Sequence, residues 1–170
     1  MPAPPGVAYG SVVQRPDPRG SFREVWRKSE RDEPFVQLNL SVSAPRVLRG
    51  MHLHLRQIDH WIVVRGRLFC ALVDVRPLLR ADGRPAVDTR ELRANDTVTV
   101  PCGVAHGFLA FEETELLYLV TNEYDGTDEL GFAWDDPAVA VPWPSEWVPP
   151  LLSDRDRHNA SLEELLARLR

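Results

Sequence analysis

The sequence predicts an all-β domain: a jelly roll, or a related barrel of two sheets, that ends in a short helix. Short stretches of alternating polar and apolar residues recur along the chain, and 10 glycines and 15 prolines separate them. Strands alternate in this way when one face is buried, and Gly and Pro favour the turns between strands. Only the C-terminal residues have the spacing of apolar side chains that a surface helix needs.

Most strands are predicted from this alternation. In the segments 21–26 and 37–42 every second residue shares a face, so Gln37 and Asn39 lie on the same side of their strand. The segment 68–75 is almost continuously apolar, which is typical of a strand covered on both sides. Further strands are predicted at residues 12–13, 47–54, 61–64, 87–92, 97–100 and 115–121, with another that begins at His106.

One helix is predicted, from about Ala160 to Leu169. Four leucines, 162, 165, 166 and 169, form an apolar stripe, and Ser161 precedes them as a possible N-cap. We expect residues 1–170 to form a single domain, with a core at about 10–145 and a tail at 146–170. Asp82-Gly83 is a turn signal within it.

Composition narrows the class of protein. The chain has 170 residues, enough for one domain with a core, and 44% of them are hydrophobic. Because the start lacks the pattern of an export signal and no apolar run approaches the ~20 residues of a membrane span, we expect a cytoplasmic protein. The net charge of -5 disfavours a nucleic-acid-binding surface. Both cysteines, Cys70 and Cys102, are expected to be reduced and structural, with a nucleophilic Cys102 as the alternative.

The segment 49–66 holds several residues that could bind a metal ion or transfer a proton. His52 and His54 are two apart and therefore share one face of a strand, and Asp59 follows a short break. A later turn, Pro101-x-Gly103-x-x-His106, brings in another histidine. Imidazoles and a carboxylate on paired strands suit metal binding or proton transfer. Polar side chains on a solvated sheet face are the third interpretation, and all three stay open at this point.

Several motifs follow one another in a fixed order over about residues 10–156. They are Asp17-x-Arg19-Gly20-x-Phe22-x-Glu24, Gln37-x-Asn39-x-Ser41, Arg49-Gly50-Met51-His52, Pro101-x-Gly103-x-x-His106-Gly107-Phe108, Tyr118 to Tyr124, Trp134-x-Asp136-Pro137, Trp143-Pro144 and Leu152-Ser153-x-x-Asp156. Each motif alone is weak, but the ordered set is specific. It resembles the dTDP-4-dehydrorhamnose 3,5-epimerases, a family of the cupin superfamily, and implies a cupin-type jelly roll.

The resemblance implies an isomerase of deoxysugar biosynthesis: an epimerase that acts on a dTDP-4-keto-6-deoxyhexose at C3, C5 or both. A 4-keto group acidifies the protons at C3 and C5, so a base, a stabilised enolate and an acid suffice, without a cofactor. By resemblance His52 is the base, Asp136 holds it, and Tyr124 reprotonates the far side of the ring. An imidazole with a pKa near ~6.5 suits a base at neutral pH.

The resemblance also implies how substrate and partner bind. Substrate-binding positions within the subunit are Gln37, Asn39, Arg49, Asp59, His106 and Tyr118, with Gln37 and Asn39 on the sugar or the diphosphate. Arg19, Phe22 and Glu24 would reach the nucleotide of a second subunit. We therefore expect a homodimer in which an N-terminal arm is shared.

The sequence departs from the family at three positions. Asp59 stands where the family has a lysine, Leu119 where many members have another, and His54 near a glutamine. His52-x-His54-x4-Asp59-x6-Gly66 together with His106 resembles the metal-binding signature of cupins instead. The alternative is therefore a metal-dependent isomerase, lyase or oxygenase that holds a divalent transition metal with His52, His54, Asp59 and His106; a non-catalytic sugar-binding cupin is a third hypothesis. A metal-bound His52 could not also be the free base.

Overall fold

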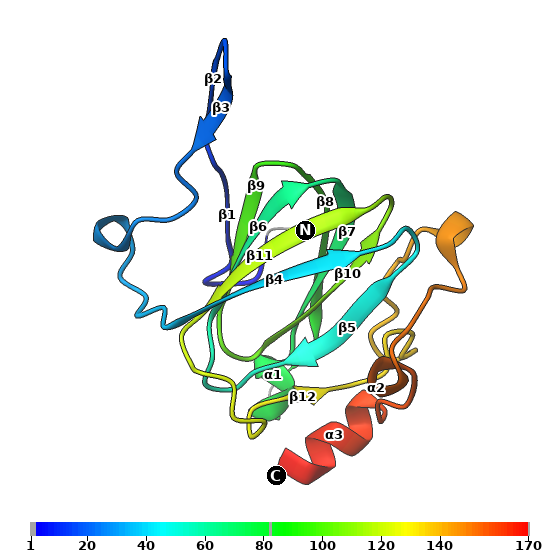
Figure 1. Cartoon of the computed structure of the whole chain (residues 1–170). Helices are drawn as coiled ribbons and strands as arrows, with labels where there is room; N and C mark the ends of the chain where they lie inside the picture. The colour runs from blue at the N-terminus through cyan, green and yellow to red at the C-terminus, as the bar shows by residue number, and fades with distance from the viewer. Residues whose placement is uncertain (1–2, 82, 170) are drawn as a thin grey trace.

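The fold is described from a computed structural model, for residues 3–81 and 83–169. Two five-stranded sheets face each other, and the pairings between neighbouring strands are antiparallel (Figure 1). The first sheet has the order β1 (Ala8–Ser11), β9 (Asp96–Val100), β6 (Asp59–Arg65), β11 (Thr114–Val120), β4 (Gln37–Ser43). The second has the order β12 (Leu130–Gly131), β5 (Leu48–Leu53), β10 (Val104–Ala110), β7 (Arg67–Asp74), β8 (Ala86–Arg93). The predicted all-β double-sheet architecture is confirmed.

The core has two parts, one on each face of the second sheet. Trp61, Leu72 and Phe108 belong to the cluster between the two sheets. Val73 and Phe132 belong to a second cluster, on the other face, which the C-terminal helix also joins. Strand β7 contributes side chains to both clusters, which explains why its sequence is apolar without alternation.

A hairpin extends away from the two sheets. It consists of β2 (Gln14–Asp17) and β3 (Gly20–Arg23), and in Figure 1 it rises above the rest of the chain. The strand predicted at 21–26 therefore ends at Arg23, whose guanidinium donates to the Val64 carbonyl and to Asn95. The leading strand lies at 8–11, not at 12–13, because residues 8–11 pair with β9.

The C-terminal helix forms as predicted, as α3 (Leu162–Leu169). Ser161 Oγ accepts a hydrogen bond from the Glu164 N–H, and Glu164 Oε2 accepts one from the Ser161 N–H. This reciprocal pair is a capping box. The sequence did not predict the short helices α1 (Arg76–Leu79), α2 (Asp154–Arg157), η1 (Lys28–Glu30) and η2 (Ser145–Trp147). Each is a single turn, too short for a periodic pattern.

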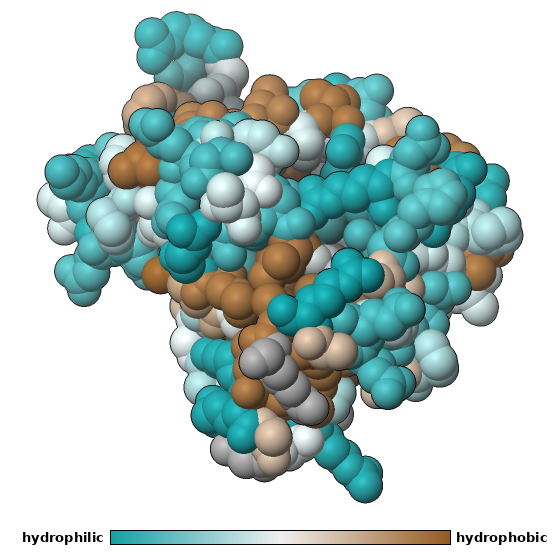
Figure 2. Space-filling model, turned by 90° about the horizontal axis from the view of Figure 1, so that it is seen from below, coloured by the Kyte–Doolittle hydropathy of each residue, from teal (hydrophilic) through white to brown (hydrophobic). Residues whose placement is uncertain are grey.

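The helices α1 and α3 lie together at the lower end of the molecule in Figure 1. Figure 2 views this end, where hydrophobic side chains gather between hydrophilic ones. Within the described part of the chain, none of the helices has the length and apolar character needed to cross a membrane. The turn predicted at Asp82-Gly83 includes Asp82, which lies outside the described residues.

Candidate active site

A cavity of about 440 Å³ opens between the two sheets. Nine of the predicted site residues line it: Gln37, Asn39, Arg49, His52, His54, Asp59, His106, Tyr118 and Tyr124. They come from both sheets and from the segments that follow β5 and β11. These nine residues, which are spread from position 37 to position 124 of the chain, thus lie around one cavity. The resemblance to the family requires such a grouping.

Close packing of β5 against β10 brings two histidines together. His52 and His106 are register partners in these strands, and their ring centroids are 6.4 Å apart. The approach depends on two glycines: a Cβ on Gly50, where φ is 140°, would lie 2.7 Å from the Gly107 Cα. Only glycine fits such a contact in this backbone conformation.

The turn before β10 is tied to the strand that carries the other histidines. Gly103 has a φ of 76°, and its N–H donates to the His54 carbonyl at 2.8 Å. The turn predicted from Pro101-x-Gly103-x-x-His106 therefore forms and delivers His106 to β10.

His52 has a carboxylate partner in the tail of the chain. Its Nε2 lies 2.7 Å from Asp156 Oδ1, and Asp156 is only 4% exposed. Burial alone would raise the pKa of Asp156, but the hydrogen bonds from His52 and Ser153, together with the nearby charges of His52 and Arg155, outweigh it, and the pKa lies below its ordinary value. Asp156 is therefore an ionised acceptor, so in the neutral form of His52 the proton is on Nε2 and the lone pair on Nδ1.

The predicted pairing of His52 with Asp136 is wrong. Asp136 Oδ2 accepts from the Leu162 N–H at 2.7 Å, and Oδ1 accepts from the Ala138 N–H. Its carboxylate thus fixes the start of α3, where negative charge is favourable. Asp136 is absent from the residues that line the cavity.

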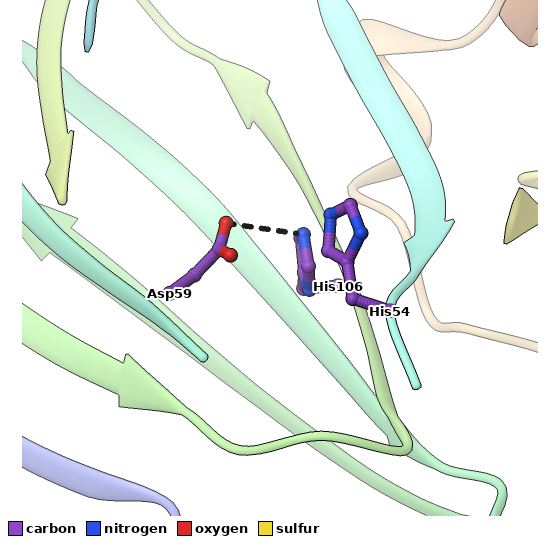
Figure 3. A group of neighbouring side chains, drawn as sticks. All are labelled: His54, Asp59 and His106. Atoms are coloured by element: carbon purple, nitrogen blue, oxygen red, sulfur yellow. Dashed lines mark ion pairs between the residues drawn. The ribbon is translucent and has the colours of Figure 1, made fainter. Parts of the chain in front are cut away.

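Three further groups converge in the cavity (Figure 3). His106 Nε2 is 3.6 Å from Asp59 Oδ2, and the His54 and His106 rings have centroids 5.3 Å apart. Burial lowers the pKa of His106 to about 4, although Asp59 opposes the shift. Since His52 Nε2 is bonded to Asp156, the four-residue metal set predicted as the alternative reduces to three residues.

Polar groups of the first sheet line the opposite side of the cavity. Gln37 Nε2 donates to Asn39 Oδ1 at 2.8 Å, which agrees with the predicted shared face. Tyr118 is the register partner of Asn39, and burial raises the pKa of its phenol. Tyr124 is 69% exposed at the rim, and its backbone N–H donates to Gln37 Oε1.

Three predicted binding residues lie outside this cavity, on the arm. Arg19 is exposed and forms an ion pair with Asp17. Phe22 and Glu24 line a second cavity near His60, and Phe22 is 63% exposed. Within one subunit the structure therefore does not bring them to His52.

Several residues that line or support the cavity have no role predicted from the sequence. Asp156 was noted only as part of a tail motif; its distance from His52 along the chain left no spacing signal. Arg155 lines the cavity and pairs with Glu129 at 2.6 Å. Ser41, also noted only in a motif, has a buried hydroxyl that finds no hydrogen-bond partner among residues 3–81 and 83–169.

Known proteins resemble this chain over most of its length. Residues 4–164 match the model of the family described as dTDP-4-dehydrorhamnose 3,5-epimerase. A dTDP-4-dehydrorhamnose 3,5-epimerase of Sinorhizobium fredii is 36% identical over 150 residues, which are 85% of this chain and 76% of that protein.

Solved structures give the same result. An epimerase of Mycobacterium tuberculosis superposes with a TM-score of 0.85 and 32% identity, covering 96% of this chain and 88% of the other. ChmJ, a 3'-monoepimerase from Streptomyces bikiniensis in complex with dTDP-quinovose, has a TM-score of 0.81 and 29% identity and covers 96% and 87%. The predicted epimerase and its cupin-type fold are confirmed, and a separate metal-dependent class is not favoured. The chain belongs to the dTDP-4-dehydrorhamnose 3,5-epimerase family.

Proposed function

We propose that this protein epimerises a dTDP-4-keto-6-deoxyhexose at C3, C5 or both, and that His52 removes the proton. The observation that carries the proposal is the part-buried hydrogen bond between Asp156 and His52, which lines the cavity. A carboxylate held on one ring nitrogen fixes the tautomer and stabilises the imidazolium that forms. Family membership supplies the substrate class.

The hydrogen-bond pattern assigns the basic atom. Because His52 Nε2 donates to Asp156, the lone pair that accepts the substrate proton is on Nδ1. As the C–H bond breaks, its electrons form a double bond to C4, and the electrons of the C4 carbonyl move onto its oxygen. The product is an enolate. The carbon is inverted when a proton returns from the other face.

We assign that second proton to Tyr124, which lines the same cavity from the other sheet's side. A phenol is a proton donor and can protonate a carbanionic carbon. The high exposure of Tyr124 gives its phenolate access to water, which restores the proton after turnover.

The cavity also offers groups for the rest of the substrate. Arg49 and Arg155 supply positive charge for the two phosphates, and guanidinium groups suit bidentate contacts with them. Gln37, Asn39 and the unpartnered hydroxyl of Ser41 supply hydrogen bonds for the sugar. An unpartnered buried hydroxyl is expected where a ligand completes the site.

We further propose a homodimer that shares its N-terminal arms. Val36, Leu38, Leu40 and Val42 are each 55% to 57% exposed; the last three lie on the outer face of β4, an edge strand, and Val36 immediately precedes it. Such a row favours contact with a second copy of the chain. In that arrangement Arg19, Phe22 and Glu24 of one arm contact the nucleotide in the partner's cavity. We also propose one domain over residues 1–170 and a cytoplasmic location.

Incubation with dTDP-4-keto-6-deoxyglucose tests the proposal. The product ring-proton couplings, measured by NMR, should report inversion at C3, C5 or both, because axial and equatorial protons couple differently. The same measurement decides between one and two epimerised carbons. An unchanged substrate after prolonged incubation with folded protein would contradict the proposed function.

A further inference from the structure

The side chains of His54, Asp59 and His106 form a compact group (Figure 3). All three line the cavity, and none of them belongs to the His52–Asp156 pair. We infer that these three residues bind one divalent transition-metal ion. Neither the hydrogen bonds of His52 nor those of Tyr124 account for this group. It is the one set of metal-ligand side chains of this kind within residues 3–81 and 83–169.

The spacing of the donor atoms suits a metal ion. One ligand atom from each residue lies within 4.8 Å of the other two, and all three residues are 4% to 6% exposed. Metal–nitrogen and metal–oxygen bonds of about 2.0–2.2 Å in tetrahedral geometry place ligand atoms roughly 3.4 Å apart. His106 Nε2 and Asp59 Oδ2 are already 3.6 Å apart, and a ligand atom of His54 lies within 4.8 Å of both residues' ligand atoms.

Hydrogen bonds to the backbone orient both imidazoles. His54 Nδ1 donates to the Asp128 carbonyl at 2.6 Å, and His106 Nδ1 faces the Val104 carbonyl at 3.4 Å. Each Nε2 therefore keeps its lone pair for a cation. Histidine ligands of metals typically donate their second ring nitrogen to a carbonyl or carboxylate in this way.

Asp59 is held as well. Gln57 Nε2 donates to its Oδ1 at 2.8 Å, and Trp61 Nε1 approaches its Oδ2 at 3.4 Å. Two neutral imidazoles and one carboxylate make a donor set that Zn²⁺ and Co²⁺ accept, with the remaining coordination positions open to the cavity. His52 stays outside this set, so a metal ion and a free base can occupy the cavity together.

A role for the ion rests on the proposed function. His52 and His106 lie face to edge, 6.4 Å apart between ring centroids, so the ion would lie beside the carbon that His52 deprotonates. The C4 oxygen is two bonds from that carbon and becomes negative in the enolate. Asp59 alone would repel that charge, whereas a divalent cation bound to Asp59 attracts it.

Titration with Co²⁺ tests the site without any substrate. The parent protein, freed of metal by a chelator, should bind one equivalent and develop the visible absorption of tetrahedral or five-coordinate Co²⁺. Asp59→Asn and His54→Gln should each weaken binding at least 10-fold. His158→Gln is the matched control, since His158 also bonds a backbone carbonyl through Nδ1 but is exposed and far along the chain. His52→Gln should bind Co²⁺ like the parent.

A second measurement needs no variant. Zn²⁺ added to the parent should shift the imidazole NMR signals of His54 and His106 and leave those of His60 and His158 unchanged. Absence of a stoichiometric Co²⁺ band in the parent would overturn the inference, and so would equal affinity in the parent and Asp59→Asn. A parent that epimerises its substrate but binds no Co²⁺ would refute the metal site and leave the proposed function intact.

Discussion

His52 Nε2 and Asp156 Oδ1 are 2.7 Å apart although 104 residues separate them in the chain. The short helix α2 presents Asp156, and Ser153 caps that helix by accepting from the Asp156 N–H. The tail of the chain therefore completes the proposed base in the cavity between the sheets.

Asp156→Asn should lower kcat by about 10²-fold or more, in the range that a positioned base contributes, with little change in KM. The amide keeps the size of the side chain but loses the charge that stabilises imidazolium. Asp136→Asn is the matched control: it should keep kcat near that of the parent while the free energy of unfolding falls by about 1 kcal/mol, because α3 loses a charged acceptor. Equal loss of kcat in both variants would contradict the assignment.

Tyr124→Phe should separate proton abstraction from inversion. Without the phenol, His52 still removes and returns a proton on the same face, so the substrate takes up solvent deuterium but its configuration stays. We expect inversion to fall by about 10²-fold. Mass spectrometry and NMR of the same sample measure both quantities, with Tyr9→Phe, outside the main cavity, as the control. Unchanged inversion would exclude Tyr124 as the acid.

Asp59→Lys places a positive charge in the group of His54 and His106. The ammonium should prevent Co²⁺ binding and at the same time stabilise the enolate, so epimerisation should continue and become insensitive to a chelator. Asp59→Ala removes the carboxylate without adding a charge and should be slower than Asp59→Lys. Turnover rates with and without chelator measure this, and a slower Asp59→Lys than Asp59→Ala would contradict the argument.

Leu40→Glu should split the proposed dimer. It puts a charge in the middle of the exposed apolar row on the outer face of β4, where a second copy of the chain would have to bury that charge. Light scattering at micromolar concentration should give a dimer for the parent and a monomer for the variant. Leu151→Glu, which changes a similarly exposed leucine elsewhere, should remain dimeric. A monomeric parent would contradict the proposed assembly.

The fold and the cavity lining were largely predictable from the sequence. Alternation placed Gln37 and Asn39 on one face, and the Pro101-x-Gly103-x-x-His106 turn placed His106 on its strand, because both depend on local backbone geometry. Periodicity cannot reveal which distant carboxylate meets His52. Asp136 and Asp156 are both buried acids near the C-terminus, and only the packing of the tail distinguishes them.

The limits of β1 and β3 were missed for a related reason. Residues 12–13 and 24–26 have strand-like sequences, but the first pair connects β1 to the hairpin and the second segment follows the hairpin. Neither segment has a strand partner in the described part of the chain. Strand propensity depends on neighbours that the sequence alone does not identify.

Solvent deuterium uptake tests the central claim most directly. In D₂O, the parent protein should place deuterium at C3, C5 or both of dTDP-4-keto-6-deoxyglucose, and NMR should show inversion at a labelled carbon. His52→Ala should lose this uptake at every carbon, because no other group in the account starts the reaction. Uptake by His52→Ala at the parent's rate would contradict the account, as would a folded parent that exchanges no carbon-bound proton.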